Sequence, residues 1–257
     1  MALRISGFPT SDALVGSLML LLGFAGISWS SIALPPSWHI ASSREISARI
    51  IGDDRFKPGI LAELQMRMAA ISQPTVLPPE LPYAKALVAV RTADEAAQRY
   101  NLDKADLEVD AAEVLLRAAL TINPNDSFLW LMLYSVATMR HGFDLKYLGY
   151  LEQSYALGAN EGWVALRRNS LALASFSLLN SATQHSANSE FAAILNSGFV
   201  DVAAINLMRV GPVARDGLLK GLDRVDITPR EALARRLLRD GVSVSVPGVK
   251  LDQRLWR

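Results

Sequence analysis

The residue types that most often perform chemistry are sparse in this chain of 257 residues. It has no cysteine, and its three histidines, His39, His141 and His185, are far apart in the sequence. A metal site needs several converging ligands, and one histidine supplies only one of them. The metalloprotease, phosphate-loop, dinucleotide-binding and nucleophile-elbow motifs do not occur. We therefore predict no catalytic residue, no metal site, no cofactor and no enzymatic activity.

Acidic residues gather in the middle of the chain, where Asp94–Asp126 holds eight acids and three bases. The spacing of Asp103, Asp106, Glu108 and Asp110 resembles a calcium loop only superficially, because the central glycine and the final glutamate of the EF-hand are missing. Acids at the starts of solvated helices explain the cluster, since they complement the helix dipole. Two carboxylates that face one cleft can also catalyse hydrolysis. An enzyme or glycan-binding accessory with an acidic cleft therefore remains the alternative.

Basic residues gather at the other end, where Arg215–Arg257 holds ten Lys or Arg and six acids. Four of them, Arg230, Arg235, Arg236 and Arg239, share one predicted helix. They form either the solvated face of that helix or a contact for an anionic ligand, such as lipid headgroups, an acidic glycan or an acidic protein patch. Because the net charge of the whole chain is only +1, we expect no nucleic-acid partner.

Aromatic and amide side chains concentrate between these two charged regions. Most of the aromatic rings fit an inter-helix core, but a few of them, with neighbouring Asn and Arg residues, can face a groove and hold a peptide by hydrogen bonds. The residues that we predict to bind a partner protein are Asn125, Trp130, Tyr134, Asn160, Trp163, Arg167, Arg168 and Asn169, together with Arg235, Arg236 and Arg239 of the basic helix.

An internal repeat organises this middle region. The pattern that begins at Leu116 returns 35 residues later at Leu151. Each copy ends a helix at a turn, and an Asn–acid pair (Asn125–Asp126 or Asn160–Glu161) begins the next helix. A third copy at 188–191 is spaced by only 28 residues, so it is the weakest of the three.

The repeat resembles the tetratricopeptide repeat, a helix-turn-helix unit of about 34 residues. Positions that match its pattern are Ala112, Leu116, Ala119 and Pro124 in one helix, and Trp130 and Leu133 in the next. Departures are Tyr134 for glycine, Ala137 for tyrosine and Ala159 for the second proline. The resemblance covers about residues 95–180, and two generic helical hairpins are the alternative. It implies a superhelical stack whose concave face binds a peptide or protein.

The N-terminal region holds 22 residues without a charge, from Ala13 to Leu34. As a helix they span about 33 Å, which is enough to cross a hydrocarbon core of roughly 30 Å. Ser11 and Asp12 precede the segment as N-caps, and Pro35–Pro36 is expected to end it. A transmembrane anchor is the preferred interpretation. A cleaved signal peptide with Ser31-Ile32-Ala33 at its end and a buried helix are the alternatives.

The orientation of this anchor does not follow from the charges beside it. Arg4 and Asp12 precede it, and Arg44, Glu45 and Arg49 follow it. Because a short N-terminal tail precedes a large C-terminal domain, we expect a single-pass protein of a bacterial inner membrane with a periplasmic soluble domain. Small residues along the helix, such as Gly26, would permit close packing if the anchor itself were the binding surface of a membrane complex.

The remaining sequence predicts helix after helix, and the fold class is all-α. Helices are expected at about 43–51, 59–72, 83–100, 199–209 and 212–223. Another is expected from a capping box at Thr228–Glu231 to Gly241. We divide the chain into a short N-terminal tail (1–12), a transmembrane helix (13–34), connecting helices and loops (35–80), a helical-repeat domain (81–240) and an extended tail (241–257).

This organisation predicts a membrane-anchored interaction scaffold or an accessory subunit of a bacterial envelope complex. Anchored tetratricopeptide-like proteins suggest polysaccharide assembly or secretion as the setting. The expected partners are the bilayer, through residues 13–34, and another protein of the envelope.

Overall fold

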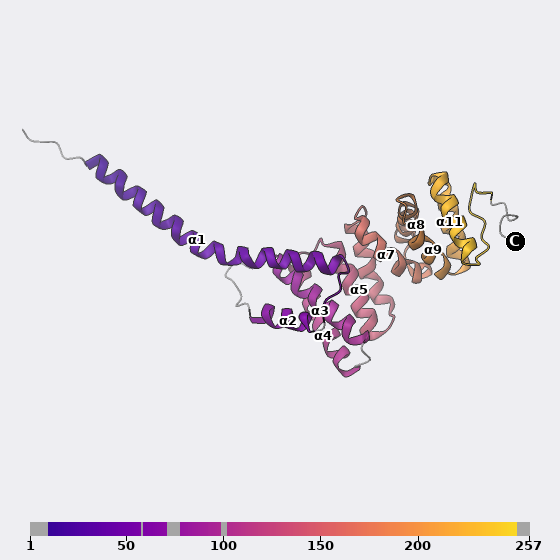
Figure 1. Ribbon diagram of the computed structural model, residues 1–257, viewed down its shortest axis with the longest axis horizontal. Helices are drawn as coiled ribbons and strands as arrows, with labels where there is room; N and C mark the ends of the chain where they lie inside the picture. Colours follow the sequence, from indigo (N-terminus) through magenta and orange to yellow (C-terminus); the bar gives the residue numbers. More distant parts are fainter. Residues whose placement is uncertain (1–9, 58, 71–77, 99–101, 251–257) are drawn as a thin grey trace, which may run out of the picture. The chain divides into compact units, whose positions relative to one another are not determined.

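The computed structural model describes residues 10–57, 59–70, 78–98 and 102–250, and all regular elements in this part are helices (Figure 1). Since no strand occurs among these residues, the predicted all-α fold class is confirmed. The chain divides into two compact units, residues 1–92 and 93–257, where the sequence suggested a boundary near residue 80. The expectations for Arg4 and for the last seven residues lie outside the described residues, as does the side chain of His39.

The first unit begins with helix α1, which runs without interruption from Thr10 to Ile51. The expected end at Pro35–Pro36 is wrong, and so is the separate helix at 43–51, because both stretches belong to α1. Each proline removes one backbone N–H donor, but a helix can continue past that loss at a local cost. Ser11 and Asp12 lie inside the first turn of α1, so neither is its N-cap.

The early part of α1 is apolar and exposed around its whole circumference. One segment, Leu14–Ser31, is long and apolar enough to cross a membrane, and none of it is buried in the chain. Its exposed large side chains include Leu14, Leu20, Phe24 and Trp29, each more than two-thirds exposed. Soluble domains rarely expose an apolar surface of this extent. By length and composition the segment suits a membrane anchor, although signal sequences have the same properties.

The rest of the first unit packs two further helices with the end of α1. These helices are α2 (Ile60–Ala70) and α3 (Glu80–Gln98), and α3 extends six residues past the boundary between the units. The small apolar core contains Ile46, Leu61, Met68, Ala84 and Val88. An ion pair between Arg44 and Glu80, 2.7 Å apart, joins α1 to the start of α3.

The second unit is a stack of antiparallel helices. Its α-helices are α4 (Leu102–Ile122), α5 (Ser127–His141), α6 (Leu148–Leu157), α7 (Gly162–Ala174), α8 (Ser181–Asn196), α9 (Val200–Arg209), α10 (Pro212–Gly221) and α11 (Ile227–Arg239). Short 3-10 helices, η1 (Leu145–Tyr147), η2 (Phe176–Leu178) and η3 (Leu222–Arg224), lie in three of the connections. The observed helices at 200–209 and 212–221 agree with the predicted ranges to within two residues.

The helices of this stack form two rows. Helix α5 contacts α7, α7 contacts α9, and α9 contacts α11, while α6 contacts α8 and α8 contacts α10. The third repeat expected at 188–191 is wrong, because those residues lie inside α8. The next comparable turn is at 197–199, and its aromatic residue, Phe199, follows Trp163 by 36 residues. Phe199 is the N-cap residue of α9, whereas Phe128 and Trp163 are the second residues of α5 and α7.

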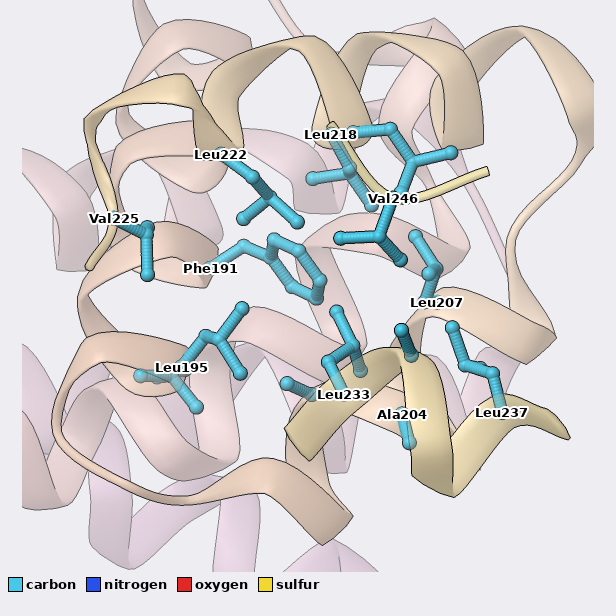
Figure 2. Packing of buried hydrophobic residues seen from close by; sticks show 14 of the residues in the cluster. Phe191, Leu195, Ala204, Leu207, Leu218, Leu222, Val225, Leu233, Leu237 and Val246 are labelled. Carbon is cyan, nitrogen blue, oxygen red and sulfur yellow. The ribbon is translucent and has the colours of Figure 1, made fainter. Parts of the chain in front are cut away.

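One apolar core of the second unit lies among α7 to α11. Figure 2 shows the ring of Phe191 at its centre, surrounded by Leu218, Leu222 and Leu233. Val246 of the C-terminal tail is also buried there, and Arg230 donates a hydrogen bond of 2.8 Å to the carbonyl of Pro247. The described part of the tail therefore packs on the stack as an extended segment.

The start of α11 differs from the predicted capping box. The helix begins at Ile227, Asp226 occupies the N-cap position, and no side-chain cap is formed there. Thr228 and Pro229 thus lie within the first turn of the helix, and the N-cap residue lies two positions before the predicted cap at Thr228.

Candidate functional site

The turn between α4 and α5 is held by a side-chain cap. Asp126 accepts a hydrogen bond of 2.9 Å from the backbone N–H of Leu129, as an N-cap residue should. Burial raises the pKa of the Asp126 carboxyl, the hydrogen bonds from Leu129 and Phe128 oppose this shift, and the negative charge of Glu161 adds to it. The carboxylate of Glu161, from the next turn, therefore acts on Asp126 here.

The turn between α6 and α7 lies against the start of α5. A side chain at Gly158 would collide with Ser127, so this close approach requires glycine. Glu161 lies at the N-cap position of α7 but makes no capping bond, and its carboxylate accepts the hydroxyl of Ser127 instead. The sequence predicted that the two acids play the same part in both copies. The structure shows that only Asp126 caps its helix.

A row of three hollows runs along the edge of the stack where these turns lie. The acidic hollow, of about 570 Å³, lies between the α4–α5 and α6–α7 turns, and the central hollow, of about 700 Å³, lies between the α6–α7 turn and α8. The basic hollow, of about 550 Å³, lies between α8 and the end of α10. Glu161 and Trp163 line both of the first two, and His185, Ser189 and Ala193 line both of the last two. Because neighbouring hollows share these lining residues, they adjoin one another, and we call the three together the turn-edge groove.

The chemistry of the groove changes along its length. Asp126 and Glu161 line the acidic hollow without any Lys or Arg. Trp163, Leu166, Ile194 and Phe199 make the central hollow mainly apolar, and Trp163 and Phe199 remain 38% and 45% exposed. The groove therefore offers separate places for charged and apolar groups.

The basic hollow carries Lys220, Arg224 and one acid, Asp223. Its wall also contains Asn188, whose buried side-chain oxygen has no hydrogen-bond partner among the described residues. A buried acceptor without a donor costs free energy, and an N–H group from a ligand would remove that cost.

A buried polar network lies beneath the central hollow. The guanidinium group of Arg168 is fully buried, and all of its nitrogen atoms donate hydrogen bonds. It donates to Glu190 at 2.6 and 3.1 Å, to the carbonyls of Ser154 and Gly158 at 2.6 and 3.0 Å, and lies 4.0 Å from the centre of the Tyr155 ring. This one side chain joins α6, α7 and α8.

Three further side chains complete this network. The Tyr155 hydroxyl donates to Glu190 at 2.5 Å, and burial together with the Glu190 charge raises the pKa of that hydroxyl well above its ordinary value. Asn169 donates to the carbonyl of Ala187 at 2.9 Å and accepts from Asn206 of α9 at 3.1 Å. Since Tyr155 and Glu190 also line the central hollow, the network fixes its floor.

The structure brings only some of the predicted binding residues into the groove. Asn125, Asn160 and Trp163 line it. The others lie elsewhere in the stack. Tyr134 is buried with its hydroxyl 3.0 Å from that of Ser175, and Arg168 and Asn169 are buried in the network. Arg167 lies over the Phe128 ring, and Trp130 packs beside Tyr150 and donates a hydrogen bond to the carbonyl of Pro124.

The expectation that Arg168 and Asn169 face a ligand is therefore corrected. Both are fully buried, and each holds neighbouring helices together through hydrogen bonds. The same correction applies to Tyr134, which is 3% exposed.

The predicted basic helix is largely neutralised by its own neighbours. Arg236 pairs with Asp201 and, at 2.9 Å, with Asp240, while Arg235 lies 3.5 Å from Glu231. Arg239 is exposed without an ion pair in the described part of the chain. An anionic ligand at α11 would have to compete with these acids for Arg235 and Arg236.

The acidic middle region is compensated in the same way. Arg140 pairs with Asp110 and Glu113 at 2.5 and 3.0 Å, and Arg117 pairs with Glu113 at 2.8 Å. No group of three His, Asp or Glu residues that could hold a metal ion occurs among the described residues.

Sequence reasoning missed the groove residues Glu190, Phe199, Lys220 and Arg224. Glu190 follows Ala187 by three residues and precedes Ile194 by four, so its register on the apolar face of α8 indicated burial. Phe199 was missed because its spacing from Trp163 is 36 rather than 35 residues. Nothing in the sequence placed Lys220 and Arg224 beside α8.

Comparisons of the chain with protein-family models, with curated proteins and with solved structures found no match.

Proposed function

We propose that this protein is a membrane-anchored interaction scaffold, whose helical stack binds an extended segment of another protein in the turn-edge groove. The observation that carries this proposal is the groove itself. Three adjoining hollows cross several helix turns, and two exposed aromatic rings, Trp163 and Phe199, stand at the central one. Exposed aromatic residues beside a concavity are typical anchors of protein interfaces.

The scaffold interpretation rests further on the arrangement of the helices. Two rows of successive helices are compatible with a tetratricopeptide-like stack, in which turns and helix faces form an elongated binding surface. The apolar part of α1 would hold this stack at a bilayer, and a bacterial inner membrane with the stack in the periplasm is our preferred setting. A place in polysaccharide assembly or secretion, and the absence of an enzymatic activity, are part of the same proposal.

A matched pair of variants tests this function. Full-length protein is purified from detergent-solubilised membranes, and co-purifying proteins are quantified by mass spectrometry. Trp163→Ala combined with Phe199→Ala removes the two exposed rings of the groove, whereas Leu145→Ala removes a still more exposed apolar side chain outside it. We expect the double variant to lose about nine-tenths of a stoichiometric partner, because removing interface anchors of this kind costs more than about 1 kcal/mol each.

The control variant should retain its partner at the wild-type level. Recovery of the same partner in the same amount by the double variant would contradict the proposal, and so would the absence of any stoichiometric partner from wild-type protein. Circular dichroism of each variant checks that the stack remains folded.

A further inference from the structure

The proposed function leaves open what kind of segment binds, and the charges of the groove bear on this question. Asp126 and Glu161 both line the acidic hollow, and the negative charge of Glu161 helps to raise the pKa of Asp126. Asp126 receives backbone N–H groups and Glu161 receives a neutral hydroxyl, so no basic side chain that lines this hollow offsets either carboxylate. A positively charged group placed here would be attracted by both.

The other end of the groove attracts a negatively charged group. Lys220 and Arg224 are exposed, and neither forms an ion pair within the described part of the chain. Asp223 leaves this hollow with one excess positive charge. The side-chain oxygen of Asn188 beside them has no hydrogen-bond partner among the described residues, and a peptide backbone supplies the N–H donor that it lacks.

Between these ends lies a surface that suits apolar side chains. Trp163, Leu166 and Phe199 line the central hollow, and small residues of α8, Ser189 and Ala193, leave room for a backbone to approach. A nucleic acid would require positive charge along the whole groove, and a small molecule would fill one hollow only. A peptide is the ligand whose chemistry can change along its length as the groove does.

We infer that the turn-edge groove recognises an extended peptide segment with a basic group at the Asp126–Glu161 end, apolar side chains over Trp163 and Phe199, and an acidic group at the Lys220–Arg224 end. This inference rests on the proposed scaffold function and adds the polarity of the partner. The complementary charges orient the segment and exclude segments of uniform charge.

A peptide selection tests this polarity without knowledge of the natural partner. A phage-displayed library of random twelve-residue peptides is selected on the full-length protein in lipid nanodiscs. We expect selected peptides to carry Lys or Arg toward one end, Asp or Glu toward the other and apolar residues between them. A synthetic peptide of the enriched sequence, with versions in which both ends are basic or both acidic, then serves as the probe for fluorescence anisotropy.

Neutral substitutions assign each charge to its end of the groove. Asp126→Asn with Glu161→Gln keeps a capping side chain and an acceptor for Ser127, so it changes charge with little change of structure. We expect this variant to weaken binding of the enriched peptide about tenfold. It should remove only the preference for a basic end and leave the preference for an acidic end unchanged. Lys220→Gln with Arg224→Gln should remove only the preference for an acidic end, and the exposed pair Glu45→Gln and Arg55→Gln serves as the control outside the groove.

Several results would overturn the inference. These are selected peptides of uniform charge, equal affinity for the three synthetic versions, or an unchanged preference in the neutral variants. If the charge variants have no effect but loss of Trp163 and Phe199 still releases the partner, the polarity is wrong and the scaffold function stands. If no peptide is selected and the partner is also unaffected, both proposals fail.

Discussion

Two clusters of arginine and glutamate join neighbouring helices of the stack, and they differ in their contact with water. In the interior cluster, Arg168 is fully buried and pairs with Glu190. In the surface cluster, Glu113 pairs with Arg117, which is 48% exposed. The two glutamates are equally buried, at 8% exposed, but water reaches the arginines only in the surface cluster, where Arg140 is also 35% exposed.

This difference teaches what each cluster contributes. A buried ion pair carries a desolvation penalty as large as the attraction between its charges, so its net stabilisation is small. Removing only one of the two partners is costly, because the other charge is then buried without compensation. Arg168 also fixes the carbonyls of Ser154 and Gly158, and therefore the α6–α7 turn that carries Glu161 and Trp163 into the groove. The interior cluster sets the geometry of the site, whereas the surface cluster adds a modest attraction between α4 and α5.

The largest expected effect comes from breaking the interior pair. Arg168→Ala leaves Glu190 buried without its cation, and we expect the free energy of unfolding to fall by about 3–5 kcal/mol. Urea unfolding of the full chain in mild detergent, followed by circular dichroism, measures the loss.

A double replacement is the control for this variant. Arg168→Met with Glu190→Leu removes both charges together and should recover part of the stability that Arg168→Ala loses. A double variant as unstable as the single one would show that the hydrogen bonds to Ser154 and Gly158, rather than the unpaired carboxylate, dominate the effect.

A smaller effect is expected from the hydroxyl that completes the interior cluster. Tyr155→Phe keeps the ring against Arg168 but removes the 2.5 Å hydrogen bond to Glu190. We expect a loss of about 1–3 kcal/mol, because a buried charged acceptor is left with one donor fewer. The matched control is Tyr150→Phe, whose hydroxyl receives a hydrogen bond from Arg117 at the surface, and here we expect a change within about 0.5 kcal/mol. Equal losses in the two variants would remove the distinction between the clusters.

The fold was more predictable from the sequence than the site was. The all-α class followed from helical periodicity, and the helix positions in the second unit followed from turns at Pro124, Gly158 and Gly211. Pro35–Pro36 misled because proline lowers the stability of a helix without always ending it.

Adjacent arginines show how the site could have been predicted better. Arg168 has Val164 four residues before it and Ala172 four residues after it, so it belongs to the apolar face of α7. Arg167 is turned by about 100° from that face. Periodicity thus separates a structural arginine from a surface one. The groove itself could not be found in this way, because its walls come from turns that meet only after the helices stack.

The smallest expected effect tests the surface cluster through pH. Hydrogen bonds from Arg117 and Arg140 lower the pKa of Glu113 below its ordinary value of 4.5, although burial alone would raise it. A lowered carboxyl pKa gives stability that is complete above the ordinary value and is lost as the pH falls through the lowered value. We expect Glu113→Gln to cost less than about 1 kcal/mol at pH 7, because water reaches Arg117, and we expect this difference from wild type to shrink as the pH is lowered from about 6 to about 3. Urea titrations of both proteins across this range measure it. If the difference in free energy of unfolding between wild type and Glu113→Gln grew as the pH fell, the ionised Glu113 carboxylate would be destabilising. Burial would then dominate the energetics of the surface cluster as it does those of the interior cluster.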